Sequence, residues 1–306
     1  TLLYYFLSYY FVYSFFLLAV HPQLLLGADA TPPALAVKLV FIHHSTGGHW
    51  LAAPNPDNPH GDLGTALKDN NYYVSATNYC WGPDEIGSRT DIVNWPEWFT
   101  GPNHEAIMTA LVNETGQHLT DCDGNTFGPW PRSAADPGGE NIVILFKSCF
   151  PNSNLYGAPD DPPYSAPNDW EYSVGNAKAV YNHILTYFAA HRNKLFVVIT
   201  APPMTRNEYG EDPDLSQAQR AANARAFNNW LVDDWLDGYA YDNVAVFDYF
   251  NILTHRDNHH RVAGGAVEHA TSPLSSNFSY YPLNDWDSHP NTAGQQKATA
   301  EFVPLL

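Results

Sequence analysis

Two polar segments at opposite ends of the sequence carry residue types that could take part in nucleophilic and acid–base chemistry. Residues 43–49 read HHSTGGH and contain Ser45, and residues 284–294 read NDWDSHPNTAG and contain His289. A histidine can act as general base for a serine hydroxyl, and a carboxylate beside it can hold the imidazole in the required tautomer. Asp287 and Asp285 are the neighbouring carboxylates. Ser45 and His289 are therefore candidates for a nucleophile and its general base, although each segment taken alone also fits a helix cap or a turn.

A third polar segment could stabilise the negative charge that such an attack creates. Residues 147–154 read KSCFPNSN and contain Asn152 and Asn154. Side-chain amides can donate hydrogen bonds to a developing oxyanion. Both asparagines remain candidates, since a Pro-Asn-Ser sequence also forms a turn by itself.

Each of these segments adjoins an element that could position it. Short apolar runs predict buried strands at 38–42, 72–76, 141–146, 195–200 and 243–247. Amphipathic patterns predict helices at 61–70 and at 291–302, and two more that begin after caps at Ser173 and Ser216. Gly238 is expected to end the helix that begins after Ser216. Alternating strands and helices indicate an α/β fold, a parallel sheet covered on both faces. Such sheets bind ligands beyond the carboxyl ends of their strands, where the first and third segments would lie.

The composition indicates one large globular domain. The chain has 306 residues, of which 44% are hydrophobic and 14% aromatic, too apolar for a disordered protein. Residues 79–140, rich in Trp, Pro, Gly and Asn, have one helix candidate at 104–112 and no apolar core of their own. We interpret them as a long loop insertion within a single domain, 31–306.

Charge and cysteine content restrict the partners. With 14 Lys and Arg against 32 Asp and Glu, the net charge of −18 argues against nucleic acid and against anionic lipid surfaces. Cys80, Cys122 and Cys149 are too few for a disulfide scaffold. One disulfide with one free thiol, or three free thiols, both fit the sequence.

The N-terminal residues predict export. Residues 1–28 carry no formal charge and 1–20 are nearly all apolar, followed by small residues at Ala28 and Ala30. This pattern is typical of a secretory signal peptide over 1–30. The alternatives are an uncleaved membrane anchor and a segment folded into the core. We expect a secreted or extracytoplasmic protein, in contact with a membrane only if the anchor is retained.

The order of these segments resembles the SGNH (GDSL-like) hydrolase superfamily, in an uncharacterised bacterial-type branch. The resemblance covers about residues 36–304 and is strongest over 287–294, DSHPNTAG. The segment 78–82, NYCWG, stands where the superfamily has a glycine block, which makes Gly82 its candidate. Here His43 and His44 precede Ser45 in place of Gly-Asp, and Trp286 stands where the superfamily has its aspartate.

The resemblance implies a three-layer α/β/α fold with a five-stranded, mainly parallel, flavodoxin-like sheet. It implies ester hydrolysis by Ser45 and His289, with Asp287 preferred over Asp285 as the orienting carboxylate and a Ser-His dyad left open. The oxyanion hole would be formed by Ser45, Gly82 and either Asn152 or Asn154, and His44 and Trp81 would contact the substrate. No metal or organic cofactor is implied. The expected substrate is a glycan or small-molecule O-acyl ester, whose acyl group and alcohol stay undetermined.

Two other functions fit parts of the sequence. A metal-dependent hydrolase could use the histidines clustered at His43, His44 and His49 or at His255, His259 and His260. A non-catalytic carbohydrate-binding module could stack sugar rings on Trp81, Trp95, Trp98 and Trp130.

Overall fold

The computed structural model describes residues 29–56, 59–133, 135–209 and 214–306. Most of the expected signal peptide or anchor, residues 1–28, lies outside the described residues. Within the described residues no helix is both long enough and apolar enough to cross a bilayer.

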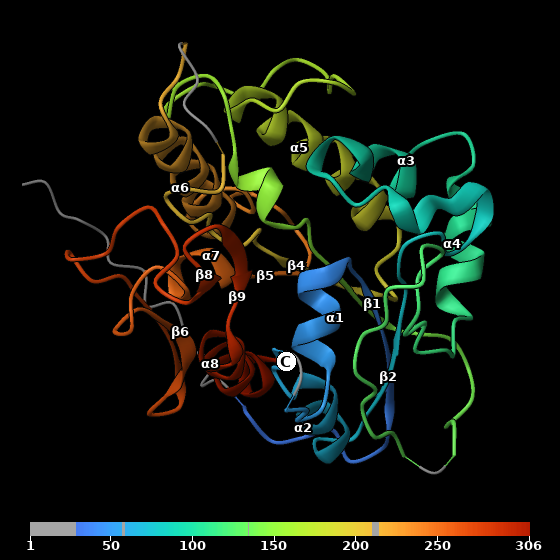
Figure 1. Cartoon of the computed structure of the whole chain (residues 1–306). Helices are drawn as coiled ribbons and strands as arrows, with labels where there is room; N and C mark the ends of the chain where they lie inside the picture. Colours follow the sequence, from blue (N-terminus) through green and yellow to red (C-terminus); the bar gives the residue numbers. More distant parts are fainter. Residues whose placement is uncertain (1–28, 57–58, 134, 210–213) are drawn as a thin grey trace, which may run out of the picture.

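The core of the molecule is a five-stranded parallel sheet in the order β2-β1-β3-β4-β5 (Figure 1). Its strands are β1 (Val37–Ile42), β2 (Tyr72–Ala76), β3 (Val143–Phe146), β4 (Leu195–Ile199) and β5 (Val244–Phe247). They match the five apolar runs to within two residues at each end. The strand order is that of a flavodoxin-like doubly wound sheet, so the α/β prediction is confirmed.

Both faces of the sheet are buried because alternate side chains of each strand point in opposite directions. In β1, Val40 and Ile42 join one apolar cluster, while Leu39 and Phe41 join the other. The first face is covered by α3 (Trp95–Phe99), α4 (His104–Val112), α5 (Val174–Ala190) and α6 (Gln217–Asp233). The second is covered by α1 (Ser45–Leu51), α2 (Leu63–Asp69) and α8 (Thr292–Phe302). The result is the expected three-layer α/β/α arrangement.

The predicted caps are present at the helix N-termini. Ser173 and Ser216 each accept a backbone N–H three residues on, and Asn291 does the same at the start of α8. The predicted end of α6 at Gly238 is wrong, because the helix ends at Asp233. Gly238, with φ of 77°, lies in the turn that follows.

The insertion at 79–140 packs into the domain through its aromatic side chains. Besides α3 and α4 it contains two 3₁₀ helices, η1 (Pro83–Ser88) and η2 (Ile92–Asn94). Trp81 and Trp98 stack 5.9 Å apart on the first face of the sheet, and Trp95 lies beside them, fully buried. Trp130 is buried in the cluster on the second face. The structure therefore does not support the alternative in which these four tryptophans stack on sugars, because they form part of the core.

A disulfide joins two parts of the insertion, its start just after β2 and the segment around Cys122. Cys80 is bonded to Cys122, and Cys149 is free and buried. Of the two arrangements that the sequence left open, the structure has one disulfide and one thiol.

The remaining elements were not expected from the sequence. They are α7 (Tyr249–Ile252), two more 3₁₀ helices, η3 (Phe150–Ser153) and η4 (Val303–Leu305), and two hairpins, β6–β7 (His259–Ala263, Ala266–Ala270) and β8–β9 (Pro282–Asn284, Asp287–Pro290). The first hairpin turns at Gly264 and Gly265, both with positive φ. A Gly-Gly pair between short strands is a recognised hairpin signal, so β6–β7 was predictable.

Buried neutral histidines make the stability of this fold depend on pH. His260 packs against Phe247 and its Nδ1 accepts the backbone N–H of Asp248. Burial lowers the pKa of His260 from about 6.5 to about 4. Between these values the unfolded chain binds a proton that the folded chain does not, so stability is lost as the pH falls.

We expect His260→Asn, which keeps an acceptor near the position of Nδ1, to reduce proton uptake on unfolding at pH 5 by about one proton. Urea unfolding between pH 7 and pH 4 measures how steeply the free energy of unfolding changes with pH, and this slope reports the proton uptake. The matched control is His183→Asn, an exposed position on α5. Equal slopes for the wild type and His260→Asn would contradict the assignment.

Candidate active site

Ser45 is fixed at the carboxyl end of β1 as the first residue of α1. The sequence suggested a loop here, but the two glycines that follow allow a helix to begin close against its surroundings. A Cβ at Gly47 would lie 2.3 Å from Cβ of His43, and one at Gly48 would lie 2.6 Å from the ring of Phe127. Only glycine lets the helix approach so closely, and this approach holds Ser45 at the sheet edge.

Ser45, His289 and Asp287 form a chain of short contacts. Ser45 Oγ lies 2.7 Å from His289 Nε2, although the two residues are 244 positions apart in the sequence. His289 Nδ1 lies 2.6 Å from Asp287 Oδ1, which also accepts the backbone N–H of His289. The ring of Phe150 meets the His289 ring edge to face, at 4.9 Å between centroids. The expected nucleophile, base and carboxylate thus meet at the carboxyl edge of the sheet.

The extended backbone of β9 explains why Asp287 reaches His289 from two residues away. Side chains at i and i+2 of a strand lie on the same face. The intervening Ser288 points the opposite way and is buried, accepting the Thr205 N–H and donating to Glu208. Asp285 is exposed in the turn before β9, where its carbonyl oxygen accepts the Thr205 hydroxyl. The structure therefore brings Asp287 to the histidine, and not Asp285.

A cavity of about 590 Å³ opens over Ser45 and His289. Tyr79 and Phe127 give it aromatic walls, and Asp121 and Asp123 add carboxylates to that of Asp287. Among the described residues no lysine or arginine lines it. A cavity with this lining suits hydroxyl-rich or positively charged groups better than anionic ones.

The two predicted substrate contacts do not line this cavity. His44 is buried behind Tyr79, with its ring stacked on the Tyr79 ring at 3.9 Å and its Nε2 2.8 Å from the Gly87 carbonyl oxygen. Trp81 is a core residue whose indole N–H donates to Glu114 at 2.5 Å. These assignments are corrected: the aromatic group that faces the cavity after β2 is Tyr79.

The predicted oxyanion donors other than Ser45 are also placed elsewhere. Gly82 is exposed at the start of η1 and does not line the cavity. The buried amide of Asn152 is engaged by η2, since its Nδ2 donates to Asp91 at 2.6 Å and its Oδ1 accepts the Ile92 N–H at 2.7 Å. Asn154 lies outside the cavity lining as well. The structure therefore places none of these three residues in the cavity lining, and for Asn152 the reason is that its amide is bonded to Asp91 and Ile92.

The histidines around the nucleophile are uncharged near neutral pH. Burial, the largest cause for each, lowers the pKa of His43 to about 3 and those of His44 and His49 to about 4. The loop that carries Ser45 therefore adds no positive charge to the cavity.

The two histidine clusters do not converge on a common point. His259 pairs with Glu301 at 2.9 Å, whereas His260 binds the backbone of Asp248. Over the part of the chain that the structure describes, no three His, Cys, Asp or Glu side chains form a group that could hold a metal ion. The metal-dependent alternative therefore has no ligand set to rest on.

Two residues beside the nucleophile were missed from the sequence. Cys149 Sγ lies 2.9 Å from Thr46 Oγ1 and 3.8 Å from Ser45 Oγ, and Tyr79 faces the cavity. Both directly follow strands that flank β1 in the sheet, namely β3 and β2. Position after a strand was the signal that could have identified them.

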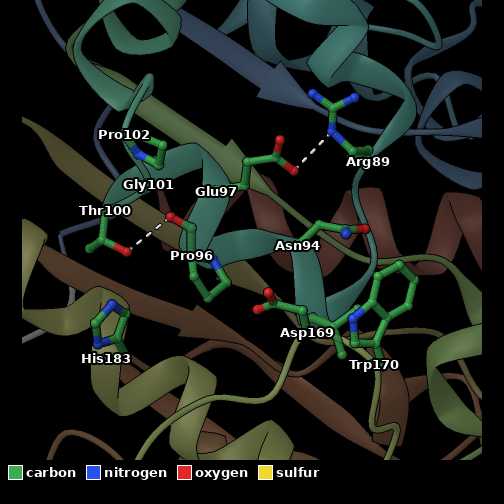
Figure 2. Close-up of a pocket in the computed structure, with 11 residues that line it drawn as sticks. Arg89, Asn94, Pro96, Glu97, Thr100, Gly101, Pro102, Asp169, Trp170 and His183 are labelled. Carbon is green, nitrogen blue, oxygen red and sulfur yellow. Dashed lines mark hydrogen bonds and ion pairs between the residues drawn. The ribbon is translucent and has the colours of Figure 1, made fainter.

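A second hollow, of about 490 Å³, lies between α3 and the start of α5 (Figure 2). It is lined by Arg89 and Glu97, which pair at 2.8 Å, and by Trp170, whose side chain is 89% exposed. Neither Ser45 nor His289 takes part in it. The groups able to carry out chemistry therefore gather in the first cavity.

Comparisons with known proteins add no family to this picture. No family model matches the chain, and no curated protein matches it. A solved structure is similar to this chain at 12% sequence identity and a TM-score of 0.35. The match covers 86% of this chain and 93% of the other. A likeness of this size carries no argument about the site.

The disulfide beside the cavity gives a test of this geometry. Because Cys122 adjoins the cavity residues Asp121 and Asp123, we expect reduction to loosen that wall and to lower the free energy of unfolding by about 2–4 kcal/mol. Urea unfolding with and without dithiothreitol measures the loss. The double variant Cys80→Ser/Cys122→Ser should match the reduced wild type and not respond to reductant. A wild type indifferent to reductant would argue against the bond.

Proposed function

We propose that this protein is a serine ester hydrolase that cleaves O-acyl esters of neutral glycans or small alcohols. The observation that carries the proposal is the contact chain from Ser45 Oγ through His289 to Asp287. The sequence resemblance to SGNH hydrolases supports it, because that resemblance implies the same three residues.

The geometry suits attack by Ser45 followed by hydrolysis of an acyl-enzyme. Asp287 accepts a hydrogen bond from the Nδ1–H of His289, which leaves Nε2 free to take the proton of Ser45 as Oγ bonds to the ester carbonyl carbon. The tetrahedral intermediate collapses when the ester C–O bond breaks, and His289 returns the proton to the leaving alcohol. Water then attacks the acyl-serine by the same route, which releases the acid and restores Ser45.

The charge of the cavity disfavours anionic substrates. The carboxylates of Asp121, Asp123 and Asp287 face it, and the whole chain carries a net charge of −18. An ester with a nearby carboxylate or phosphate would be repelled, and the catalytic imidazolium already has its counter-ion in Asp287.

The alternatives have less support than esterase activity. The tryptophans proposed for a binding-only module are buried in the core.

A disulfide between Cys80 and Cys122 is in keeping with export to an oxidising compartment, as the N-terminal sequence predicts.

The proposal is tested by labelling Ser45 with a fluorophosphonate probe and by following p-nitrophenyl acetate hydrolysis. We expect wild-type labelling at Ser45, and a loss of at least about 1,000-fold in kcat/KM for Ser45→Ala. Thr65→Ala, on α2, is the hydroxyl-to-alanine control and should retain activity. A wild type that is neither labelled nor active would refute the proposal.

The choice between the two carboxylates has its own test. We expect Asp287→Asn to lower kcat by about 100- to 10,000-fold, because the amide no longer fixes the tautomer of His289. Asp285→Asn should stay within about twofold of the wild type, since its side chain is exposed in the turn before β9. Steady-state kinetics on p-nitrophenyl acetate decide between them, and the reverse ranking would transfer the role to Asp285.

A further inference from the structure

Ester hydrolysis at Ser45 needs hydrogen-bond donors for the oxyanion, and the side chains that the sequence suggested do not supply them. Asn152 is engaged with Asp91, while Gly82 and Asn154 lie outside the cavity. The backbone N–H of Ser45 remains as one donor. Since removal of one donor from such a site typically costs about 3 kcal/mol of barrier, a second donor is to be sought within the cavity.

Most polar groups of the cavity wall are unsuited to this role. The carboxylates of Asp121 and Asp123 only accept hydrogen bonds. The amide of Asn125 donates to Asp121 at 2.9 Å, and the hydroxyl of Thr126 pairs with that of Thr120 at 3.1 Å. The Cys149 thiol is a weak donor that already contacts Thr46.

Tyr79 differs from these groups because its hydroxyl lies at the nucleophile. Tyr79 and Ser45 line the same cavity, and both the side chain and the backbone of Ser45 act on the Tyr79 hydroxyl, lowering its pKa against the larger effect of burial. Its ring is held by stacking on His44, at 3.9 Å between centroids and 16° between planes, and His44 is itself buried and fixed to the Gly87 carbonyl. The phenol oxygen is thus positioned in advance beside the atom that attacks.

We propose that Tyr79 is a further catalytic residue, whose hydroxyl donates a hydrogen bond to the oxyanion formed when Ser45 attacks an ester. The inference rests on the proposed function. In the proposed step, the carbonyl π electrons move to the oxygen as the Ser45 Oγ–carbon bond forms, and the O–H of Tyr79 and the N–H of Ser45 donate hydrogen bonds to that oxygen. The phenol keeps its proton throughout, and the electron pair returns to re-form C=O when the alcohol leaves.

The protonation state of Tyr79 fits this role. Burial is the largest influence on it and raises its pKa above the ordinary value of a tyrosine. The hydroxyl therefore remains a donor at neutral and mildly alkaline pH, where Ser45 and His289 would operate.

The test is Tyr79→Phe, which removes one oxygen and keeps the ring that stacks on His44. We expect kcat for p-nitrophenyl acetate to fall by about 100- to 1,000-fold with KM within about threefold, because the bond strengthens only in the transition state. The rate of fluorophosphonate labelling should fall as well. Tyr280→Phe, half exposed and outside the cavity, is the matched control and should behave as wild type.

Each result supports or overturns the role. If kcat is unchanged in Tyr79→Phe, whether or not KM rises, then Tyr79 only packs in the site or contacts the bound substrate, and the proposed catalytic role is overturned. Should Tyr79→Phe fail to fold, as judged by near-ultraviolet circular dichroism, 3,5-difluorotyrosine at position 79 replaces it. Its lower phenol pKa should move the alkaline limb of the kcat–pH profile to lower pH, and an unmoved limb would overturn the role.

Failure of this inference differs from failure of the esterase proposal. If activity requires Ser45 but is indifferent to the Tyr79 hydroxyl, esterase function stands and this role falls. If the wild type is neither labelled nor active, the esterase proposal itself falls, and the Tyr79 role falls with it.

Discussion

The contact between Ser45 Oγ and His289 Nε2 is the constraint to which the rest of the architecture is fitted. It joins the residue that follows the first strand to the residue that precedes the last helix, and it exists because both α1 and α8 pack on the same face of the sheet. The indole N–H of Trp50 on α1 donates to Thr299 on α8, which locks the two helices side by side (Figure 1). A displacement between these helices would separate nucleophile from base.

The insertion between β2 and β3 serves the site in two ways. Trp81, Trp95 and Trp98 are buried against the first face of the sheet and Trp130 against the second. Asn152 fastens η2 to the loop after β3. This anchoring lets the insertion present Tyr79 and the segment from Asp121 to Phe127 at the cavity, with the Cys80–Cys122 disulfide holding the two parts together. The tryptophans of the insertion are therefore structural, while Tyr79, Phe127 and its polar side chains form the wall that a substrate would meet.

The fold was largely predictable from local pattern. Short β-branched runs bounded by turns specify buried parallel strands, and the serine caps at Ser173 and Ser216 specify where helices begin, because these preferences act over a few residues. The hairpin β8–β9 was not predictable in this way. Its strands are short and polar, so it is held by tertiary bonds from Ser288 to Thr205 and Glu208 more than by strand propensity.

The sequence by itself determined the α/β class, the sheet edge at which chemistry would gather, and the residues Ser45, His289 and Asp287 as candidates. Tertiary structure alone decided which polar groups share the cavity. Trp81, Asn152 and Tyr79 all follow strands of the sheet, yet packing buries the first, framework hydrogen bonds engage the second, and only the third faces Ser45. The sequence specifies the type and order of the side chains. The direction in which each side chain points and the groups to which it bonds depend on contacts between segments distant in sequence.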